Sequence, residues 1–229
     1  MQYDYFNLWT TPLLVAMDED YDSLKDKAIE QALTYYKPNY THVAGILKDN
    51  LYESEFNFFD IAREKEFKEL LYIEDRLKAS FINMFLDYFK SNHYPWPGGM
   101  GDLENVNEDN IHVDFHEGWV HISEGRGSYH GTHNHPNSSW SAIYCLEVSD
   151  VAKEKGGLLQ FNCPYNNMYS DAGLFFQSEY SIFELCPRNG GMFFFPSNVK
   201  HMATPYHGDR TRIIISVNMK VNIGDNNNV

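Results

Sequence analysis

The residues best suited to chemistry are two histidines, His133 and His135, that one residue separates in the segment Tyr129–Ser138. Residues two apart in an extended strand point to the same face, so an extended segment here would let both imidazoles bind one metal ion. Neutral imidazoles suit iron, zinc, copper or nickel. His201 is the best candidate for a third ligand, because it follows an apolar run and a turn that would bring it to the mouth of a barrel.

A second signal lies in the alternating segment that begins at Arg212. One face of this segment is wholly apolar and consists of Ile213, Ile215, Val217 and Met219. The other face carries Arg212 and Ser216 and is expected to line the interior of the barrel. An inward arginine is costly unless it meets an anion, and a carboxylate is its natural bidentate partner. No acidic residue is an obvious mate, so the pattern favours a bound dicarboxylate.

Other side chains in the same region leave alternatives open. Three histidines on earlier predicted strands could each serve as a substitute metal ligand: His112, His116 and His121. Two carboxylates, Asp114 and Glu117, could also supply an oxygen ligand. His130 is out of phase with His133 and His135, so it is expected behind the metal ligands or at the surface.

The chain after residue 110 has the sequence pattern of a β protein, with short apolar or alternating runs between turn residues. Eight strands are predicted there, at Ile111–Phe115, Gly118–Ser123, Ser139–Val148, Gly157–Asn162, Ser181–Leu185, Gly191–Phe195, His201–Thr204 and Arg212–Met219. Eight short strands closed into two packed sheets make a jelly roll, or double-stranded β-helix. Three other segments are expected to be irregular: Pro95–Asn110 and Pro164–Glu179, which would form pocket walls and a lid, and the tail Gly224–Val229.

The first ninety residues favour helices. Leu24, Ala28, Ala32 and Tyr36 recur at helical spacing, with Asp22 or Ser23 as a plausible N-cap. A stronger amphipathic pattern extends from Phe67 to Tyr88. Each helix needs a surface to cover its apolar stripe, so both are expected to brace the outside of one sheet. The chain is thus predicted to be one domain over residues 1–229, with helical support in 1–92 and a β-helix core in 111–219.

Composition narrows the class of protein. The 229 residues carry a formal net charge of −14, which weighs against nucleic acid and anionic membranes as partners. Three scattered cysteines match neither a disulfide framework nor a zinc module. The chain shows neither a signal peptide nor a stretch long enough to span a bilayer, so a soluble cytoplasmic protein is expected. The sequence does not indicate an oligomeric state.

These motifs resemble those of the iron(II)/2-oxoglutarate oxygenases, in which a histidine pair or a His-x-acid pair precedes a distal histidine and then an arginine. More narrowly, they resemble a family of such oxygenases found in bacteria and marine phages. The resemblance covers roughly Trp119 to Met219. It is carried by His133-x-His135-Pro136-Asn137-Ser138 with Ser141, Tyr144 and Leu146, and by Phe195-Pro196-Ser197, His201, Pro205, Arg212 and Ser216-Val217-Asn218.

The resemblance implies a double-stranded β-helix and a role for each of these residues. His133, His135 and His201 would hold iron(II), which 2-oxoglutarate would chelate. Arg212 would pair with the distal carboxylate, helped by Ser216 or Ser141. Oxidative decarboxylation to succinate would accompany oxidation of a substrate, with hydroxylation of an unactivated C–H bond as the default outcome. A small molecule or a peptide would be the substrate, with a slight preference for a peptide or an amino acid.

Two departures from the wider superfamily keep other functions open. The superfamily usually has Asp or Glu where His135 stands, and it often has a serine where Ile214 stands. The first alternative is therefore a three-histidine, cupin-like oxygenase that needs no oxoacid. The second is a jelly-roll binding module without catalysis, which would close the metal site and leave no open coordination position.

Overall fold

The computed structural model describes residues 11–37, 51–91, 107–163 and 182–224. Its helices are α1 (Tyr21–Leu33), α2 (Phe58–Glu64) and α3 (Lys68–Ser91), with a 3₁₀ turn, η3 (Glu108–Asn110). One sheet has six strands in the order β1 (Leu14–Met17), β8 (Gly191–Pro196), β5 (Trp140–Glu147), β10 (Arg212–Ile223), β3 (Ile111–Ser123) and β2 (Leu51–Glu53). The other has four, in the order β4 (Ser128–His133), β9 (His201–Tyr206), β6 (Leu159–Asn162) and β7 (Ile182–Leu185).

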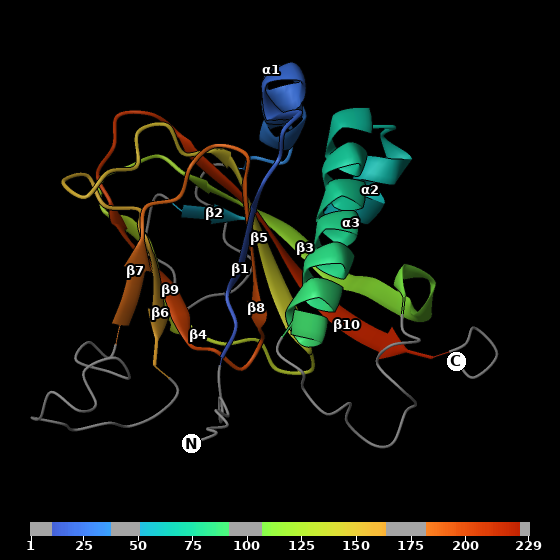
Figure 1. Cartoon of the computed structure of the whole chain (residues 1–229). Helices are drawn as coiled ribbons and strands as arrows, with labels where there is room; N and C mark the ends of the chain where they lie inside the picture. Colours follow the sequence, from blue (N-terminus) through green and yellow to red (C-terminus); the bar gives the residue numbers. More distant parts are fainter. Residues whose placement is uncertain (1–10, 38–50, 92–106, 164–181, 225–229) are drawn as a thin grey trace, which may run out of the picture.

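Every strand pair in the two sheets is antiparallel, and the helices lie on the side of the larger sheet (Figure 1). This arrangement confirms the predicted β-helix braced by N-terminal helices. The six-stranded sheet is the middle layer, because the helices cover one of its faces and the four-stranded sheet covers the other. Residues that alternate along its strands therefore enter two different environments.

Strand β10 shows this alternation most clearly. Its odd-numbered residues Ile213, Ile215, Val217 and Met219, the face predicted to be wholly apolar, all belong to the cluster beneath the helices. Ile214 instead packs in a smaller cluster between the two sheets. Arg212 and Ser216, in phase with Ile214, line the cavity between the sheets. The sequence pattern thus sets which side chains reach the candidate site.

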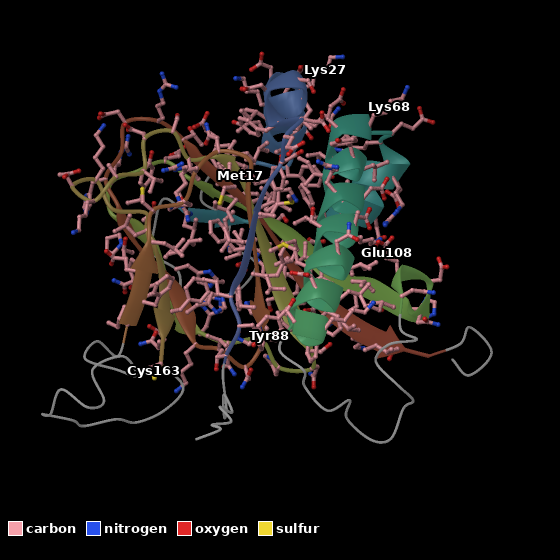
Figure 2. The ribbon with its side chains drawn as sticks, in the orientation of Figure 1. Met17, Lys27, Lys68, Tyr88, Glu108 and Cys163 are labelled. Carbon is pink, nitrogen blue, oxygen red and sulfur yellow. The ribbon has the colours of Figure 1, made fainter. Side chains whose placement is uncertain are left out.

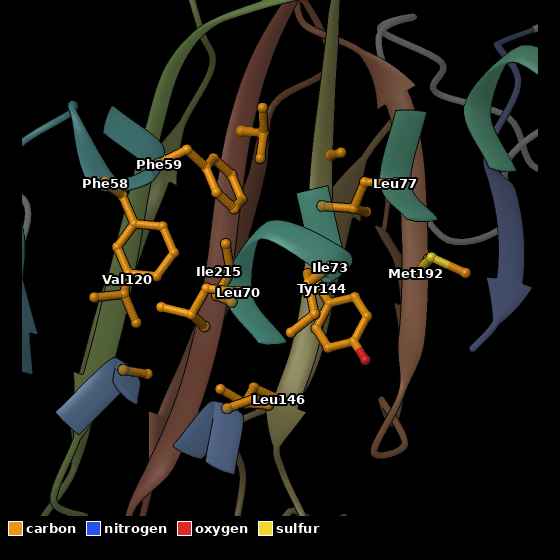
Figure 3. Close-up of a cluster of buried hydrophobic side chains, with 14 of the residues drawn as sticks. Phe58, Phe59, Leu70, Ile73, Leu77, Val120, Tyr144, Leu146, Met192 and Ile215 are labelled. Carbon is orange, nitrogen blue, oxygen red and sulfur yellow. The ribbon is translucent and has the colours of Figure 1, made fainter. Parts of the chain in front are cut away.

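The helices fix the middle sheet from outside. Figure 2 labels Lys68, the exposed first residue of α3, and Tyr88 in its last turn. Figure 3 shows Phe58 of α2 beside Val120 of β3, and Leu77 and Ile215 belong to the same buried cluster. Helix α1 begins at Tyr21 after Asp20, not after Asp22 or Ser23 as predicted. The apolar stripe includes Tyr21 itself, whose hydroxyl donates to the Leu146 carbonyl at 2.9 Å, so packing sets the start of the helix.

Several elements differ from the predicted ones. The strands predicted at Ile111–Phe115 and Gly118–Ser123 form one strand, β3, with an irregularity opposite Asn218 and Met219 that absorbs an extra residue. The structure also has elements that the sequence did not predict: α2, β1, β2 and β4. The two N-terminal strands have four and three residues, too few for a periodic signal.

Some predictions lie outside the described residues. They concern the segment Pro164–Glu179, most of Pro95–Asn110 and nearly all of the tail from Gly224. In the described part of the chain, no helix combines the length and the apolar character needed to cross a bilayer.

Replacement of Phe81 by alanine should destabilise the fold by about 3–5 kcal/mol, because it leaves a cavity where helix and sheet meet. Phe81 is fully buried, with its ring centroid 5.3 Å from Trp140 and 5.7 Å from Phe194. Urea unfolding followed by circular dichroism measures the loss. Leu33→Ala is the control, since Leu33 is 41% exposed and its truncation should cost about 0.5 kcal/mol or less. A loss below about 1 kcal/mol for Phe81→Ala would contradict this account of the core.

Candidate functional site

Three histidines converge between strands β4 and β9. His133 ends β4 and lies opposite His201, the first residue of β9, in the antiparallel register. One ring nitrogen from each of His133, His135 and His201 lies within 4.8 Å of the other two. His135 follows the end of β4, so the extended-strand argument for its direction was wrong. A turn places it instead: its backbone N–H donates to the Ser197 carbonyl at 2.9 Å, and Asn137 adopts a positive φ of 64°.

Backbone carbonyls orient two of the three rings. His133 Nδ1 lies 2.7 Å from the Gly131 carbonyl oxygen, and His201 Nδ1 lies 3.0 Å from the Val199 carbonyl oxygen. A carbonyl can only accept, so each Nδ1 carries the proton and each Nε2 presents a lone pair. His135 Nε2 and His201 Nε2 are 3.3 Å apart. Two nitrogens at about 2.1 Å from one metal ion are separated by about 3.0–3.4 Å, so this spacing suits shared ligation.

Burial keeps these imidazoles neutral. Desolvation lowers the pKa of His135 to about 2 and that of His201 to about 3, and the neighbouring histidines add to both effects. Desolvation also lowers the pKa of His133, although the hydrogen bond to the Gly131 carbonyl opposes it. A transition metal binds the neutral imidazole, so the histidines are ready to bind at neutral pH without first losing a proton.

Arg212 lies in the same cavity and is only 4% exposed. Within the described residues, no carboxylate lies within ion-pair distance of its guanidinium, and its Nε has no hydrogen-bond partner. Desolvation lowers its pKa. A Cβ on Gly157, which has a φ of 78°, would stand 2.9 Å from Tyr206 Cδ2 and 3.4 Å from Arg212 Cδ. The backbone therefore packs directly against the arginine stem.

Among the hydroxyl groups that line this cavity, those of Ser141, Ser216 and Ser128 have different hydrogen-bond partners. The Ser141 hydroxyl lies 2.8 Å from Ser197 Oγ and donates to Asn218 Oδ1 at 3.1 Å. Ser216, on the same face of β10 as Arg212, is 8% exposed. Ser128 was missed by the sequence analysis, and its buried Oγ has no hydrogen-bond partner among the described residues. Its location opposite Tyr206 in the β4–β9 pair follows from long-range register, which no local pattern reveals.

The alternative ligands are placed elsewhere. Asp114 is exposed on β3, and Glu117 accepts a hydrogen bond from Asn218 Nδ2 at 2.7 Å. Among the described residues, neither carboxylate joins a group able to hold a metal, nor does His112 or His116. His121 and His130 do belong to such a group, together with a carboxylate that the sequence analysis did not single out. His130 is buried, so the alternative of a surface position for it was wrong.

The described side chains leave about 40 Å³ of free space between them. That volume holds water rather than a five-carbon dicarboxylate, because one water needs on the order of 10–15 Å³ measured in this way. The wall combines apolar groups, among them Trp119, Ile143 and Phe195, with the histidines, the arginine and the serines.

Acid should destabilise the metal-free protein partly through His201. Its folded pKa is about 3, so between pH 6.5 and pH 3 the unfolded chain, with the ordinary pKa of 6.5, binds a proton that the folded chain does not. The contribution of His201 to the free energy of unfolding is therefore fully present above about pH 6.5. It is smaller by about 2 kcal/mol at pH 5.

Urea unfolding at pH 7.5 and pH 5, with a chelator present, tests this effect. The decrease in the free energy of unfolding from pH 7.5 to pH 5 should be about 2 kcal/mol smaller in His201→Asn than in the wild type. His207→Asn is the control, because His207 is exposed on the loop after β9 and should leave the loss unchanged. Equal losses in the wild type and His201→Asn would refute the assignment of a depressed pKa to His201.

Comparisons with known proteins bear on the fold and on the family. The chain resembles a Trichoplax adhaerens prolyl hydroxylase solved with a hypoxia-inducible-factor peptide fragment, at 15% identity and a TM-score of 0.55 over 90% of this chain and 82% of that one. It resembles a Pseudomonas putida prolyl-4-hydroxylase at 15% identity and a TM-score of 0.50, over 93% and 94%.

A third solved structure, the non-heme α-ketoglutarate-dependent epimerase SnoN from nogalamycin biosynthesis, gives 12% identity and a TM-score of 0.53 over 91% of this chain and 77% of that one. At such identities these likenesses establish the double-stranded β-helix alone. A comparison with curated proteins gives no match.

Residues 117–218 match the family model described as "Putative 2OG-Fe(II) oxygenase". The matched region contains the three converging histidines and the buried arginine. The cofactors of this family are iron(II) and 2-oxoglutarate, and the donors present suit both, because neutral imidazoles bind a transition metal and an unpaired guanidinium binds a carboxylate. Over residues 117–218 the chain is therefore similar to the 2-oxoglutarate- and iron(II)-dependent oxygenases.

Proposed function

We propose that this oxygenase holds iron(II) on His133, His135 and His201, binds 2-oxoglutarate against Arg212, and hydroxylates a C–H bond of a peptide or amino-acid substrate. One observation carries the proposal. The buried guanidinium of Arg212 has no carboxylate partner among the described residues and shares its cavity with the three histidines. Such a group is costly in the folded protein unless a ligand neutralises it.

Arg212 would bind the carboxylate of 2-oxoglutarate that is farther from the metal. Its fork of N–H donors matches a carboxylate in two-point geometry, and burial strengthens the attraction because water is excluded. Ser216 lies two residues beyond Ile214 on the same face of the strand, where its hydroxyl can donate to the same carboxylate. The Ser128 hydroxyl, unpartnered among the described residues, is a second candidate donor. We assign Ser141 a supporting part, because its hydroxyl is bonded to Ser197 and Asn218.

The three histidines would hold the metal as neutral ligands. Bound iron(II) and 2-oxoglutarate supply the oxidising power of this family, with dioxygen consumed and succinate and carbon dioxide released. The protein's own part is to orient His133 and His201 through the carbonyls of Gly131 and Val199 and to keep water away with apolar walls. Because no ligand is charged, an anionic partner at the metal is favoured, and 2-oxoglutarate is one.

The fold and the cavity wall both bear on the substrate class. Two of the solved structures with this fold are prolyl hydroxylases, one of them bound to a peptide fragment. Fold likeness at this level is an analogy and does not carry a substrate with it. The apolar cavity wall agrees with a substrate that presents an aliphatic C–H bond to the metal.

A second candidate function is compatible with the same fold. His135 replaces the carboxylate that the wider superfamily uses, which favours a three-histidine oxygenase without an oxoacid. Arg212 is the observation against it, since such an enzyme has no need of a buried cation beside its metal.

Loss of a metal ligand should abolish oxoacid turnover. Protein purified without air and supplied with iron(II), 2-oxoglutarate and ascorbate should form succinate slowly even without substrate, and faster with a hydroxylatable peptide. His201→Ala should reduce succinate to background, because two histidines bind iron far less tightly than three. His207→Ala replaces an exposed histidine and should retain the wild-type rate. Mass spectrometry of a peptide panel, scored for a gain of one oxygen, tests the substrate class in the same samples. Wild-type turnover in His201→Ala would exclude the proposed ligand set.

Removal of the guanidinium should weaken 2-oxoglutarate binding without removing the metal site. Arg212→Met keeps the apolar stem but loses the charge, so half-maximal succinate formation should need about 100-fold more 2-oxoglutarate, equivalent to about 3 kcal/mol. Arg210→Ala is the matched control, because Arg210 is exposed two residues earlier. If Arg212→Met formed succinate at the wild-type concentration of 2-oxoglutarate, another group would have to bind the distal carboxylate. Succinate formation that is absent in the wild type itself would favour the oxoacid-independent candidate.

A further inference from the structure

A second group of possible metal ligands lies beside the three histidines. Glu53, His121 and His130 are 2%, 6% and 9% exposed, and one ligand atom from each lies within 4.8 Å of the other two. Glu53 is the last residue of β2 and stands directly opposite His121 of β3 in the antiparallel register. His130 comes from β4, in the other sheet. The group therefore spans the gap between the two sheets.

The carboxylate of Glu53 is incompletely satisfied. Its Oε2 lies 2.6 Å from His121 Nε2, but its Oε1 is buried and has no hydrogen-bond partner among the described residues. A buried carboxylate oxygen without a partner is costly, by more than a neutral group would be. One imidazole cannot satisfy both oxygens, so this site calls for a further positive charge or donor.

His130 can supply a nitrogen ligand to an ion at this position. It is 9% exposed, and one of its ring nitrogens lies within 4.8 Å of a ligand atom of Glu53 and of His121. Its ring centroid is 4.8 Å from that of His121 and 3.9 Å from that of His133. The stacking on His133 places this group in contact with the first one, while its three members are all distinct from the three histidines already described.

We propose that Glu53, His121 and His130 form a second divalent-metal site, next to the three-histidine site. Two imidazoles and one carboxylate are a ligand set that iron(II), zinc or manganese accepts. The ion would neutralise the Glu53 carboxylate, and it would join the six-stranded sheet to the four-stranded sheet. The proposal does not depend on which residues carry the oxygenase reaction, because none of its ligands takes part in the function proposed above.

A model without a second metal ion predicts a different result. In that model, Glu53 only accepts a hydrogen bond from His121 and helps to orient the neighbouring rings. Loss of such an orienting group weakens an existing metal site by about 10–100-fold but does not change how many ions bind. The number of ions therefore separates the two arrangements, whereas affinity alone does not.

Zinc titration of the full-length, chelator-treated protein tests the proposal, because zinc has no redox chemistry to complicate the count. Equilibrium dialysis with zinc below the concentration at which surface carboxylates bind should give two equivalents for the wild type. Glu53→Gln and His130→Ala should each bind one, and His201→Ala should also bind one. Glu74→Gln is the matched control, because Glu74 is another buried carboxylate, paired with Arg63 and Lys78 on the helical side. This variant should bind two equivalents of zinc.

One tight equivalent in the wild type would overturn the proposal, and so would two equivalents in Glu53→Gln. Circular dichroism of each variant shows whether it is folded, and the conservative Glu53→Gln change keeps the result interpretable if His130→Ala does not fold. Succinate formation is scored separately. Two equivalents without succinate would leave this proposal standing while the proposed function fails, and succinate with one equivalent would do the reverse.

Discussion

Strand β10 is buried on both of its faces, and this burial constrains the rest of the structure. This strand lies between β5 and β3, and from Arg212 to Met219 every residue is buried. One set of side chains must be apolar to pack under the helices, and the other must fit the space between the sheets. The guanidinium on the second face lies in the cavity between the sheets and has no carboxylate partner among the described residues. The fold thus buries a cation that none of the described side chains neutralises, which is costly unless a ligand does so.

Charge is distributed unevenly in the cavity. The three histidines bring no negative charge, so a divalent ion on them keeps its full charge, and Arg212 adds another positive charge on the same cavity wall. The two carboxylates of 2-oxoglutarate would meet one positive group at each end. Glu53, a buried carboxylate, belongs to the other candidate ligand group, with His121 and His130. A carboxylate is thus absent from one candidate ligand group and present in the adjacent one.

Sequence patterns predicted what depends on local alternation. The two faces of β10 follow from a period of two, and this periodicity is enough to direct Arg212 into the cavity. The pairing of His133 with His135 was also predicted, but the reason was wrong, because His135 lies beyond the end of β4 and is held by Ser197. The sequence did not predict Glu53 as a residue of a candidate metal site. It lies on a three-residue edge strand, and only the register with β3 brings it opposite His121. Long-range register of this kind leaves no trace in a single segment.

The sheet order has a consequence for synthesis on the ribosome. Strand β10 is the last of the described strands along the chain, yet it occupies an inner position between β5 and β3. The two neighbours are made long before it, and their facing edges stay unpaired until residue 223 has left the exit tunnel. A nascent chain in this state exposes strand edges that invite pairing with other chains. The histidines of β4 and β9 also precede Arg212 in the chain, so the cavity between the sheets is completed only by the last described strand.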